Sequence, residues 1–218
     1  FKVKVTNFDI IKGADVIIWT TTPWTIPANK ALAYNAGLKY VLLEINDNKN
    51  FIDRKIVIAK DLLEPFKKDT SIENIKVLNE FLGKDLKGTI CSHPFSKMGY
   101  DYDIPMLEAN FVTIEQGTGI VHCAPSHGPD DFNLCLNNNI KAIETVDGDG
   151  KYTNEIKHFE GLHIFKANNL IIEKLDEQKN LVTNGKLTHS YPHSWRSKAP
   201  LVHRATPQWF ISMESHGL

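Results

Sequence analysis

Three absences limit what this sequence can be: it has few cysteines, no long apolar run and no excess of one charge. Its 218 residues include only Cys91, Cys123 and Cys135, and no C-x-x-C pair occurs. Such scattered cysteines exclude a disulfide framework and a cysteine-based zinc site, so we expect reduced thiols. No stretch of about 18 consecutive apolar residues is present, so we expect no membrane-spanning helix and no membrane partner.

The balance of charge argues against a protein that binds along a nucleic-acid backbone. The chain has 25 Lys and Arg against 26 Asp and Glu, for a formal net charge of −1. Backbone binding needs many basic residues, whereas gripping a few nucleotides at one strand end does not. The first residues, FKVKVTNFDI, lack an initiator Met and the pattern of a signal peptide, which predicts a piece of a longer cytoplasmic protein.

Apolar and β-branched segments predict a mainly β fold with some α-helix. Strands are expected at 14–22, 39–45 and 54–60, with shorter ones within 73–81, 86–93, 119–124 and 140–146. Helical patterns cover 129–139 and 166–179, and a short helix at 59–64 would end at Pro65. This order favours a β-barrel-like core with peripheral helices over a doubly wound sheet. Residues 1–187 would form this domain, and 188–218 an extended connector.

The first stretch that could carry chemistry is WTTTPWTIPAN, residues 19–29. Alternation along a strand would place Thr20 and Thr22 on one face and Thr21 on the other. A turn after Pro23 would bring Thr25 back toward them. Hydroxyls gathered in this way suit a sugar, an ester or a phosphate. The alternative is that threonine serves only as a good strand former.

The second stretch is GTGIVHCAPSHGPDD, residues 117–131. It lacks the third glycine of a dinucleotide fingerprint, the G-x-S-x-G of a serine hydrolase and the H-x-E of a deaminase. His122 and His127 are five residues apart, so they do not share a helical face for zinc, and His122 alone could be a core residue. Asp131, in a first helical turn, could serve the helix dipole alone or hold a cationic ligand group as an ionised, outward-facing carboxylate.

Three segments together resemble one family: residues 20–29, 117–131 and 189–210 are similar to the editing domain of the isoleucyl-tRNA synthetases. They follow in the family's order along nearly the whole chain. Thr22, followed by PWT, stands where valyl and leucyl relatives are expected to have T-T-R-P, which favours the isoleucyl group. The HIGH and KMSKS signatures do not occur, so the resemblance implies no aminoacylation site in this chain, and 188–218 would return to a catalytic domain.

The resemblance implies a deacylase that hydrolyses misacylated valyl-tRNA(Ile) after transfer, with valyl-adenylate as a further candidate substrate. Asp131 would pair with the α-ammonium group, and His122 would form the wall that isoleucine cannot pass. Since no protein base is evident, a positioned water would attack the ester. The implied catalytic residues are Asp131, Thr22 and Thr25. The implied substrate-binding residues are Thr20, Thr21, Asn29, His122 and Trp19.

The resemblance also implies the partners and cofactors. The partners would be the 3′ end of aminoacylated tRNA(Ile) and the rest of the synthetase chain, in a monomer. No metal or cofactor is expected in this domain, since ATP and Mg²⁺ would serve the parent's catalytic domain. One alternative is a module that positions the tRNA 3′ end without hydrolysis. Another is an unrelated small β-rich hydrolase or nucleotide-binding domain. Cys123 and Ser126 stand where many relatives are expected to have Thr and Gly.

Overall fold

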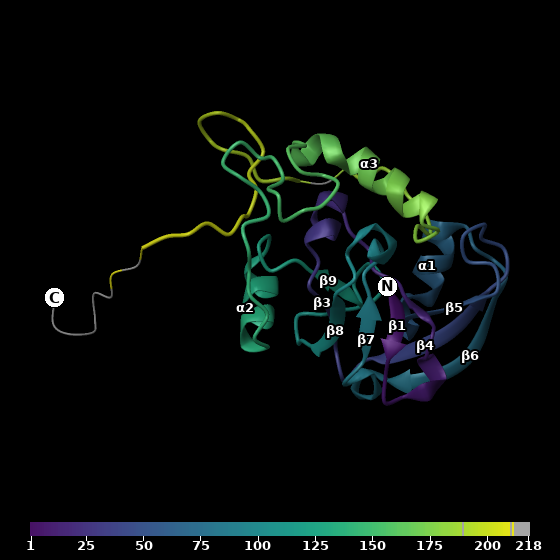
Figure 1. The fold of residues 1–218 in the computed structure, drawn as a ribbon. Helices are drawn as coiled ribbons and strands as arrows, with labels where there is room; N and C mark the ends of the chain where they lie inside the picture. The colour runs from purple at the N-terminus through teal and green to yellow at the C-terminus, as the bar shows by residue number, and fades with distance from the viewer. Residues whose placement is uncertain (189, 210, 212–218) are drawn as a thin grey trace.

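A mixed β-sheet of nine strands forms the centre of the computed structural model, which describes residues 1–188, 190–209 and 211 (Figure 1). The strands are β1 (Lys2–Val5), β2 (Asp15–Val16), β3 (Ala31–Tyr34), β4 (Lys39–Ile45), β5 (Arg54–Ala59), β6 (Ile75–Leu82), β7 (Ile90–Ser92), β8 (Asp103–Glu108) and β9 (Val121–Cys123). Their order in the sheet is β6-β4-β5-β2-β1-β7-β8-β3-β9. The pairs β2–β5 and β3–β8 are parallel, and the other pairs are antiparallel.

The expected mainly β core with peripheral helices is confirmed, and its sheet is open. Strands β6 and β9 lie at its two edges, with no pairing between them in the described part of the chain. The edge strand β9 has only three residues and is covered by a helix, so its free backbone groups offer little surface for a further strand.

Within the described residues, three α-helices lie around the sheet: α1 (Leu63–Thr70), α2 (Pro129–Asn137) and α3 (Ile164–Glu177). Helix α3 lies across the ends of several strands, and α2 lies beside the edge formed by β3 and β9 (Figure 1). The sequence predicted α2 and α3 to within two residues at each end. Shorter 3-10 helices cover Asp9–Ile11, Pro23–Ala28, Lys60–Leu62, Gly83–Leu86 and Ser96–Met98.

Three of the expected elements are wrong in extent or kind. The strand expected at 14–22 covers only β2, because the chain leaves the sheet and turns into the 3-10 helix Pro23–Ala28. Residues 140–146 form no strand beyond an isolated bridge from Val146 to Tyr152. Helix α1 begins at Leu63 and passes through Pro65, since the third helical position has no intrahelical N–H bond for proline to remove.

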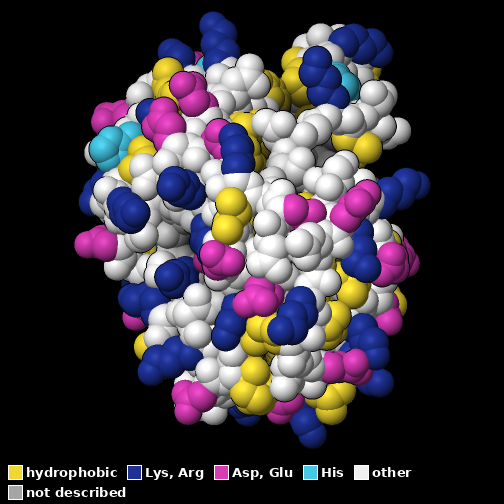
Figure 2. Space-filling view, turned by 90° about the vertical axis from the view of Figure 1, so that its right-hand side faces the viewer, with side chains coloured by type: hydrophobic (Ala, Val, Ile, Leu, Met, Phe, Trp, Pro, Cys, Tyr) yellow, Lys and Arg dark blue, Asp and Glu magenta, His cyan; other side chains and the backbone are white. Residues whose placement is uncertain are grey.

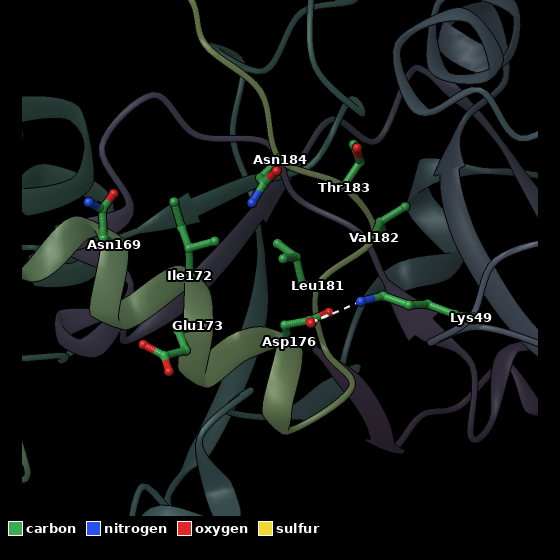
Figure 3. Close-up of a pocket in the computed structure, with 9 residues that line it drawn as sticks. All are labelled: Lys49, Asn169, Ile172, Glu173, Asp176, Leu181, Val182, Thr183 and Asn184. Carbon is green, nitrogen blue, oxygen red and sulfur yellow. Dashed lines mark hydrogen bonds and ion pairs between the residues drawn. The ribbon is translucent and has the colours of Figure 1, made fainter.

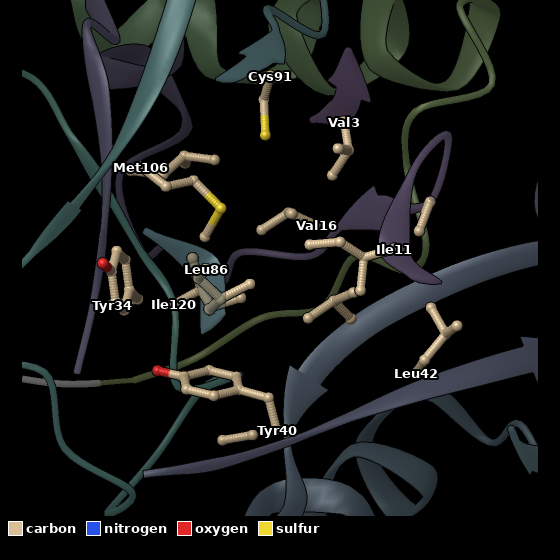
Figure 4. Packing of buried hydrophobic residues seen from close by; sticks show 14 of the residues in the cluster. Val3, Ile11, Val16, Tyr34, Tyr40, Leu42, Leu86, Cys91, Met106 and Ile120 are labelled. Carbon is tan, nitrogen blue, oxygen red and sulfur yellow. The ribbon is translucent and has the colours of Figure 1, made fainter. Parts of the chain in front are cut away.

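Two of the buried apolar clusters hold the sheet and the threonine-rich stretch in place. The first fills the sheet's interior and includes Val16, Tyr40, Leu42 and Met106 (Figure 4). The second lies under α3 and includes Trp24 of the threonine-rich stretch. Its members on α3 recur every three or four residues along one face of the helix: Ile164, Ala167, Ile171 and Leu175. Trp24 therefore anchors the threonine-rich stretch to the core by burial of apolar area.

The described tail, 190–209 and 211, contains no helix or strand apart from an isolated bridge between His193 and Pro200. Its last described residues lead away from the body of the domain in Figure 1, and Trp195 and Trp209 on the tail are exposed. The expected boundary at residue 187 stays a prediction. All three cysteines are buried and free. Among the described residues, no helix combines the length and apolar character needed to cross a membrane.

Candidate functional site

The two stretches singled out in the sequence meet where β3 pairs with β9. In this antiparallel pair Leu32 lies opposite His122, so Asn29, just before β3, lies next to the same histidine. Thr25 Oγ1 is 3.0 Å from His122 Nε2, and Asn29 Nδ2 is 3.4 Å from His122 Nδ1. All three side chains are buried. A single imidazole therefore joins the threonine-rich stretch to the glycine-rich one.

The hydrogen bonds of this network have one consistent direction. Asn29 Nδ2 donates to Ala31 O at 2.9 Å, so its amide nitrogen faces His122 Nδ1, which must accept. The proton of neutral His122 then lies on Nε2 and is donated to Thr25 Oγ1. The Thr25 hydroxyl in turn donates to Thr22 O at 2.9 Å. Burial lowers the pKa of His122 to about 4, with His127 acting in the same direction, so the ring is neutral at pH 7.

The threonines lie together through a turn and not through strand alternation. The Thr20 and Thr22 hydroxyl oxygens are 3.3 Å apart, and the Thr22 amide donates to Thr20 Oγ1 at 3.0 Å. The Thr25 amide donates to Thr22 O at 2.9 Å, which starts the 3-10 helix. Thr21 is exposed and takes no part in these bonds. The structure thus brings three of the four threonines together.

Asp131 lies in the first turn of α2 and bonds back across the β9–α2 loop to the residue that follows β9. Its Oδ2 accepts from the amide of Ala124 at 2.8 Å, two residues beyond His122. Burial raises the pKa of Asp131 to about 6, with the Ala124 bond opposing this shift and Asp130 adding to it within that value. Desolvation therefore outweighs the amide bond, and the helix start does not lower the pKa of this carboxylate below its ordinary value. Above about pH 6 Asp131 is still an anion.

The glycine-rich segment packs closely along the residues that precede the threonines. Thr118 Oγ1 donates to Ile17 O at 2.6 Å. A side chain at Gly119 would place its Cβ 2.3 Å from that of Ala59, which no real contact allows. A Cβ at Gly117 would meet the Cβ of Trp19 at 3.4 Å, so Trp19, 42% exposed, lies beside this glycine. The absence of a side chain at Gly119 is therefore what lets the glycine-rich segment approach the end of β5.

Three residues that were not predicted to belong to the site contact Trp24 of the threonine-rich stretch. Asn168 Oδ1, on α3, accepts from the Trp24 amide at 2.9 Å, and Tyr152 Oη donates to Trp24 O at 2.5 Å. The ring of His127 meets the Trp24 ring edge-on, with 4.7 Å between centroids. These partners are more than 100 residues away in the chain, so no local pattern connects them.

A second buried histidine is a satisfied core residue. His93 Nε2 donates to Ile26 O at 3.0 Å, and its Nδ1 accepts from the Phe95 amide at 3.0 Å. Burial lowers its pKa to about 3. By contrast, Asn29 Oδ1 is buried and has no hydrogen-bond partner in the described structure. Buried acceptors of this kind are rare and tend to bind a water or a ligand donor. Among the described residues, no group of three or more His, Cys, Asp or Glu could hold a metal ion.

A pocket of about 550 Å³ lies away from this network, between α3 and the segment that follows it (Figure 3). An ion pair between Lys49 Nζ and Asp176 Oδ2, 2.9 Å long, lies in it. None of the predicted site residues lines it. The surface turned toward the viewer in Figure 2 carries basic and acidic side chains side by side, with no large patch of one sign.

Comparisons with known proteins agree on a single family. The family model described as "Leucyl-tRNA synthetase, editing domain" matches residues 8–184. The isoleucine–tRNA ligase of Pelagibacter ubique (strain HTCC1062) is 71% identical over 218 residues, covering 100% of this chain and 24% of that protein. That of Gluconobacter oxydans (strain 621H) is 44% identical over 94% of this chain and 23% of its own length. The chain thus spans about a quarter of these curated relatives.

Solved structures share the fold at low identity. GlLeuRS-CP1 has a TM-score of 0.61 and 14% identity, over 79% of this chain and 84% of that chain. The editing domain of the Plasmodium falciparum cytosolic leucyl-tRNA synthetase, with insertions 1 and 3 deleted, has a TM-score of 0.58 and 12% identity over 79% and 80%. At such identities the likeness concerns the fold alone.

Proposed function

This chain belongs to the leucyl-tRNA synthetase editing-domain family and is the proofreading domain of an isoleucine–tRNA ligase, and from that premise we propose that it hydrolyses misacylated valyl-tRNA(Ile). The observation that carries the proposal is the contact of Thr25 and Asn29 with His122, next to the strand end that Asp131 caps. Valyl-adenylate, the product of an earlier misactivation, is a second candidate substrate of the same site.

A separate site is needed because valine is smaller than isoleucine. One methylene in an apolar pocket discriminates by about 1–3 kcal/mol, a value for which isoleucyl-tRNA synthetase is itself the standard example. A synthetic site cannot reject the smaller amino acid by size, whereas a second site can admit it and exclude the larger one.

In this proposal His122 supplies the excluding wall. Its ring nitrogens are held by Thr25 and Asn29, so the ring cannot turn away when a larger side chain presses against it. Burial keeps the ring neutral, which suits contact with an aliphatic group. The Asp131 carboxylate, anionic above about pH 6, pairs with the α-ammonium group that every aminoacyl ester carries. Asp131 therefore positions the substrate and does not select it.

The attacking group is a positioned water. The protein supplies hydroxyls and amides around the ester: Thr20 and Thr22 lie together, and Thr21 and Trp19 form the outer, exposed part of the stretch. His122 is not a general base, because its Nδ1 accepts from Asn29 and its Nε2 donates to Thr25. An aminoacyl ester is already activated, so orientation and donors to the oxyanion suffice. The proposal needs no metal or cofactor in this domain.

The substrate is the 3′ end of aminoacylated tRNA(Ile), delivered within a monomeric, cytoplasmic synthetase whose other domains use ATP and Mg²⁺. The mixed surface charge in Figure 2 fits contact with a few nucleotides better than with a long stretch of backbone. The tRNA would therefore bind mainly through those other domains.

The test is deacylation of valyl-tRNA(Ile) by the full-length parent enzyme. Asp131→Ala should abolish hydrolysis while leaving aminoacylation intact, and the neighbouring Asp130→Ala is the matched control. His122→Ala should make the enzyme hydrolyse isoleucyl-tRNA(Ile). Tight binding of the tRNA 3′ end with no turnover in the wild type would instead favour a module that only positions the tRNA.

A further inference from the structure

The connector bends back and binds the loop between β9 and α2. His127 Nδ1 donates to His203 O at 3.0 Å, and the Ala205 amide donates to Ser126 O at 3.0 Å. Two neighbouring residues of the loop are thus bonded to the main chain of the tail at two points. The backbone that leads away from the domain is in this way attached within five residues of Asp131.

The residue between these two points adds a third attachment. The Arg204 guanidinium pairs with the Glu144 carboxylate at 3.0 Å and donates to Val146 O at 3.3 Å. The loop at 144–146 is itself tied to His127, because Thr145 Oγ1 is 2.8 Å from His127 Nε2. The connector, the 144–146 loop and the site loop therefore form one bonded unit.

Both nitrogens of His127 have assigned roles. Nδ1 faces a carbonyl oxygen and must carry the proton, so Nε2 of the neutral ring accepts from the Thr145 hydroxyl. Burial lowers the pKa of His127 and favours this neutral form, although the bond to His203 opposes the shift. The ring has no nitrogen left for proton transfer to a substrate.

The same ring reaches the threonine-rich stretch from the other side. It lies edge-on against Trp24, 4.7 Å between centroids and at 76°. Trp24 directly precedes Thr25, whose hydroxyl bonds His122. One imidazole therefore contacts both the connector and the residue that precedes Thr25.

We propose that His127 is a positioning residue that holds the threonine-rich stretch in register with the connector, so that editing depends on how the connector is held. This inference rests on the proposed hydrolysis of valyl-tRNA(Ile). It assigns the coupling to three contacts of one side chain: the His203 carbonyl, the Thr145 hydroxyl and the Trp24 ring. A residue that only filled space there would need none of the polar contacts, since an aromatic hydrocarbon packs equally well.

The main test is His127→Phe in the full-length synthetase, which keeps a ring against Trp24 and removes both hydrogen bonds. We expect kcat for deacylation of valyl-tRNA(Ile) to fall about tenfold, with KM changed less than twofold and aminoacylation unchanged. The matched control is His203→Ala, which removes an imidazole from the connector but keeps the carbonyl that His127 uses. This control should deacylate like the wild type.

A second variant keeps the test decisive if His127→Phe folds poorly. Arg204→Ala removes the bonds from the connector to Glu144 and Val146 and should lower kcat two- to threefold. Arg196→Ala, whose guanidinium lies over the Trp195 ring, should leave kcat unchanged. Hydrogen exchange in peptides covering 22–28 should quicken in His127→Phe and Arg204→Ala and not in the two controls.

The outcomes separate this inference from the proposed function. Wild-type enzyme that deacylates, with variants that deacylate equally well, would overturn the coupling and leave the function standing. Wild-type enzyme that does not deacylate would overturn the function. In that case hydrogen exchange in peptides 22–28 still tests the coupling. The coupling is wrong if this exchange is as slow in His127→Phe and Arg204→Ala as in the wild type.

Discussion

The two ends of the sheet are built on different principles. At one end β4, β5 and β6 have seven, six and eight residues and bury aliphatic side chains such as Leu43, Ile56 and Ile58. At the other end β9 has three residues, and the buried groups next to it include Thr25, Asn29 and His122. Apolar burial is stabilising wherever it occurs, whereas buried polar groups must find partners. The first end therefore supplies stability and the second supplies the candidate site.

The largest effect is expected from breaking the aliphatic end. Leu43→Ala removes a fully buried side chain and should lower the free energy of unfolding by about 2–5 kcal/mol. Val77→Ala on β6, where the side chain is 51% exposed, is the matched control and should cost under about 0.5 kcal/mol. Urea unfolding measures both. Equal losses at the two positions would show that apolar burial is not what stabilises this end of the sheet.

The next effect is a loss of activity without a loss of stability at the polar end. Asp131→Asn keeps an oxygen for the Ala124 amide but no charge for the ammonium group, so deacylation should fall about 100-fold, or about 2.7 kcal/mol. Unfolding at pH 8 should be no easier than in the wild type. Asp130→Asn, on the exposed side of the same turn, serves as control. Full deacylation activity in Asp131→Asn would contradict the proposed contact between Asp131 and the α-ammonium group.

A smaller effect is expected from the hydroxyl that links the two stretches. Thr25→Val leaves His122 Nε2–H buried without its acceptor, which should cost about 1–3 kcal/mol of stability and lower deacylation roughly tenfold. Thr25→Ser keeps the hydroxyl and should lose less than half of either. Thermal unfolding together with deacylation rates distinguishes the two. If serine were as damaging as valine, the methyl group and not the hydroxyl would be what matters.

The pH dependence of wild type should reveal opposite trends in activity and stability. The pKa of Asp131 is raised from 3.8 to about 6, so kcat/KM for deacylation should rise up to pH 6 and then level off. The protonated carboxyl favours the folded state: that contribution is full below about pH 4 and is lost as pH rises through about 6. Asp131→Asn should lack both trends. A kcat/KM flat from pH 5 to 8 would contradict the assignment.

The smallest effect is expected at Thr21, which the resemblance places with the substrate but which lies exposed and outside the hydroxyl cluster. Thr21→Ala should change deacylation less than about threefold, since an exposed side chain with no buried partner contributes little. Kinetics on valyl-tRNA(Ile) decide the point. A tenfold loss would show that Thr21 contacts substrate directly.

Sequence reading succeeded where local pattern determines structure. Strand β4 was predicted at its observed residues. Helix α3 was predicted from the apolar spacing of Ala167, Leu170, Ile171 and Leu175, three of which are buried on it: Ala167, Ile171 and Leu175. It failed where a segment is held by distant partners. Residues 17–22 have the composition of a strand, yet the chain turns there. Tyr152 donates to Trp24 O and Asn168 accepts from the Trp24 amide, and these hydrogen bonds hold the turn. The roles assigned to Asp131, His122 and the threonines stay predictions.

The sequence by itself determined which residue types could form a site: a hydroxyl-rich stretch, a glycine-rich stretch and an acid at a helix start. Only the tertiary structure decided that His122 lies between Thr25 and Asn29, that Asp131 has a raised pKa, and that His127 joins the connector to Trp24. The physical reason is that residue type and spacing determine only short-range preferences along the chain. Burial and hydrogen-bond partners depend on segments about 80 to 150 residues apart that the fold brings together.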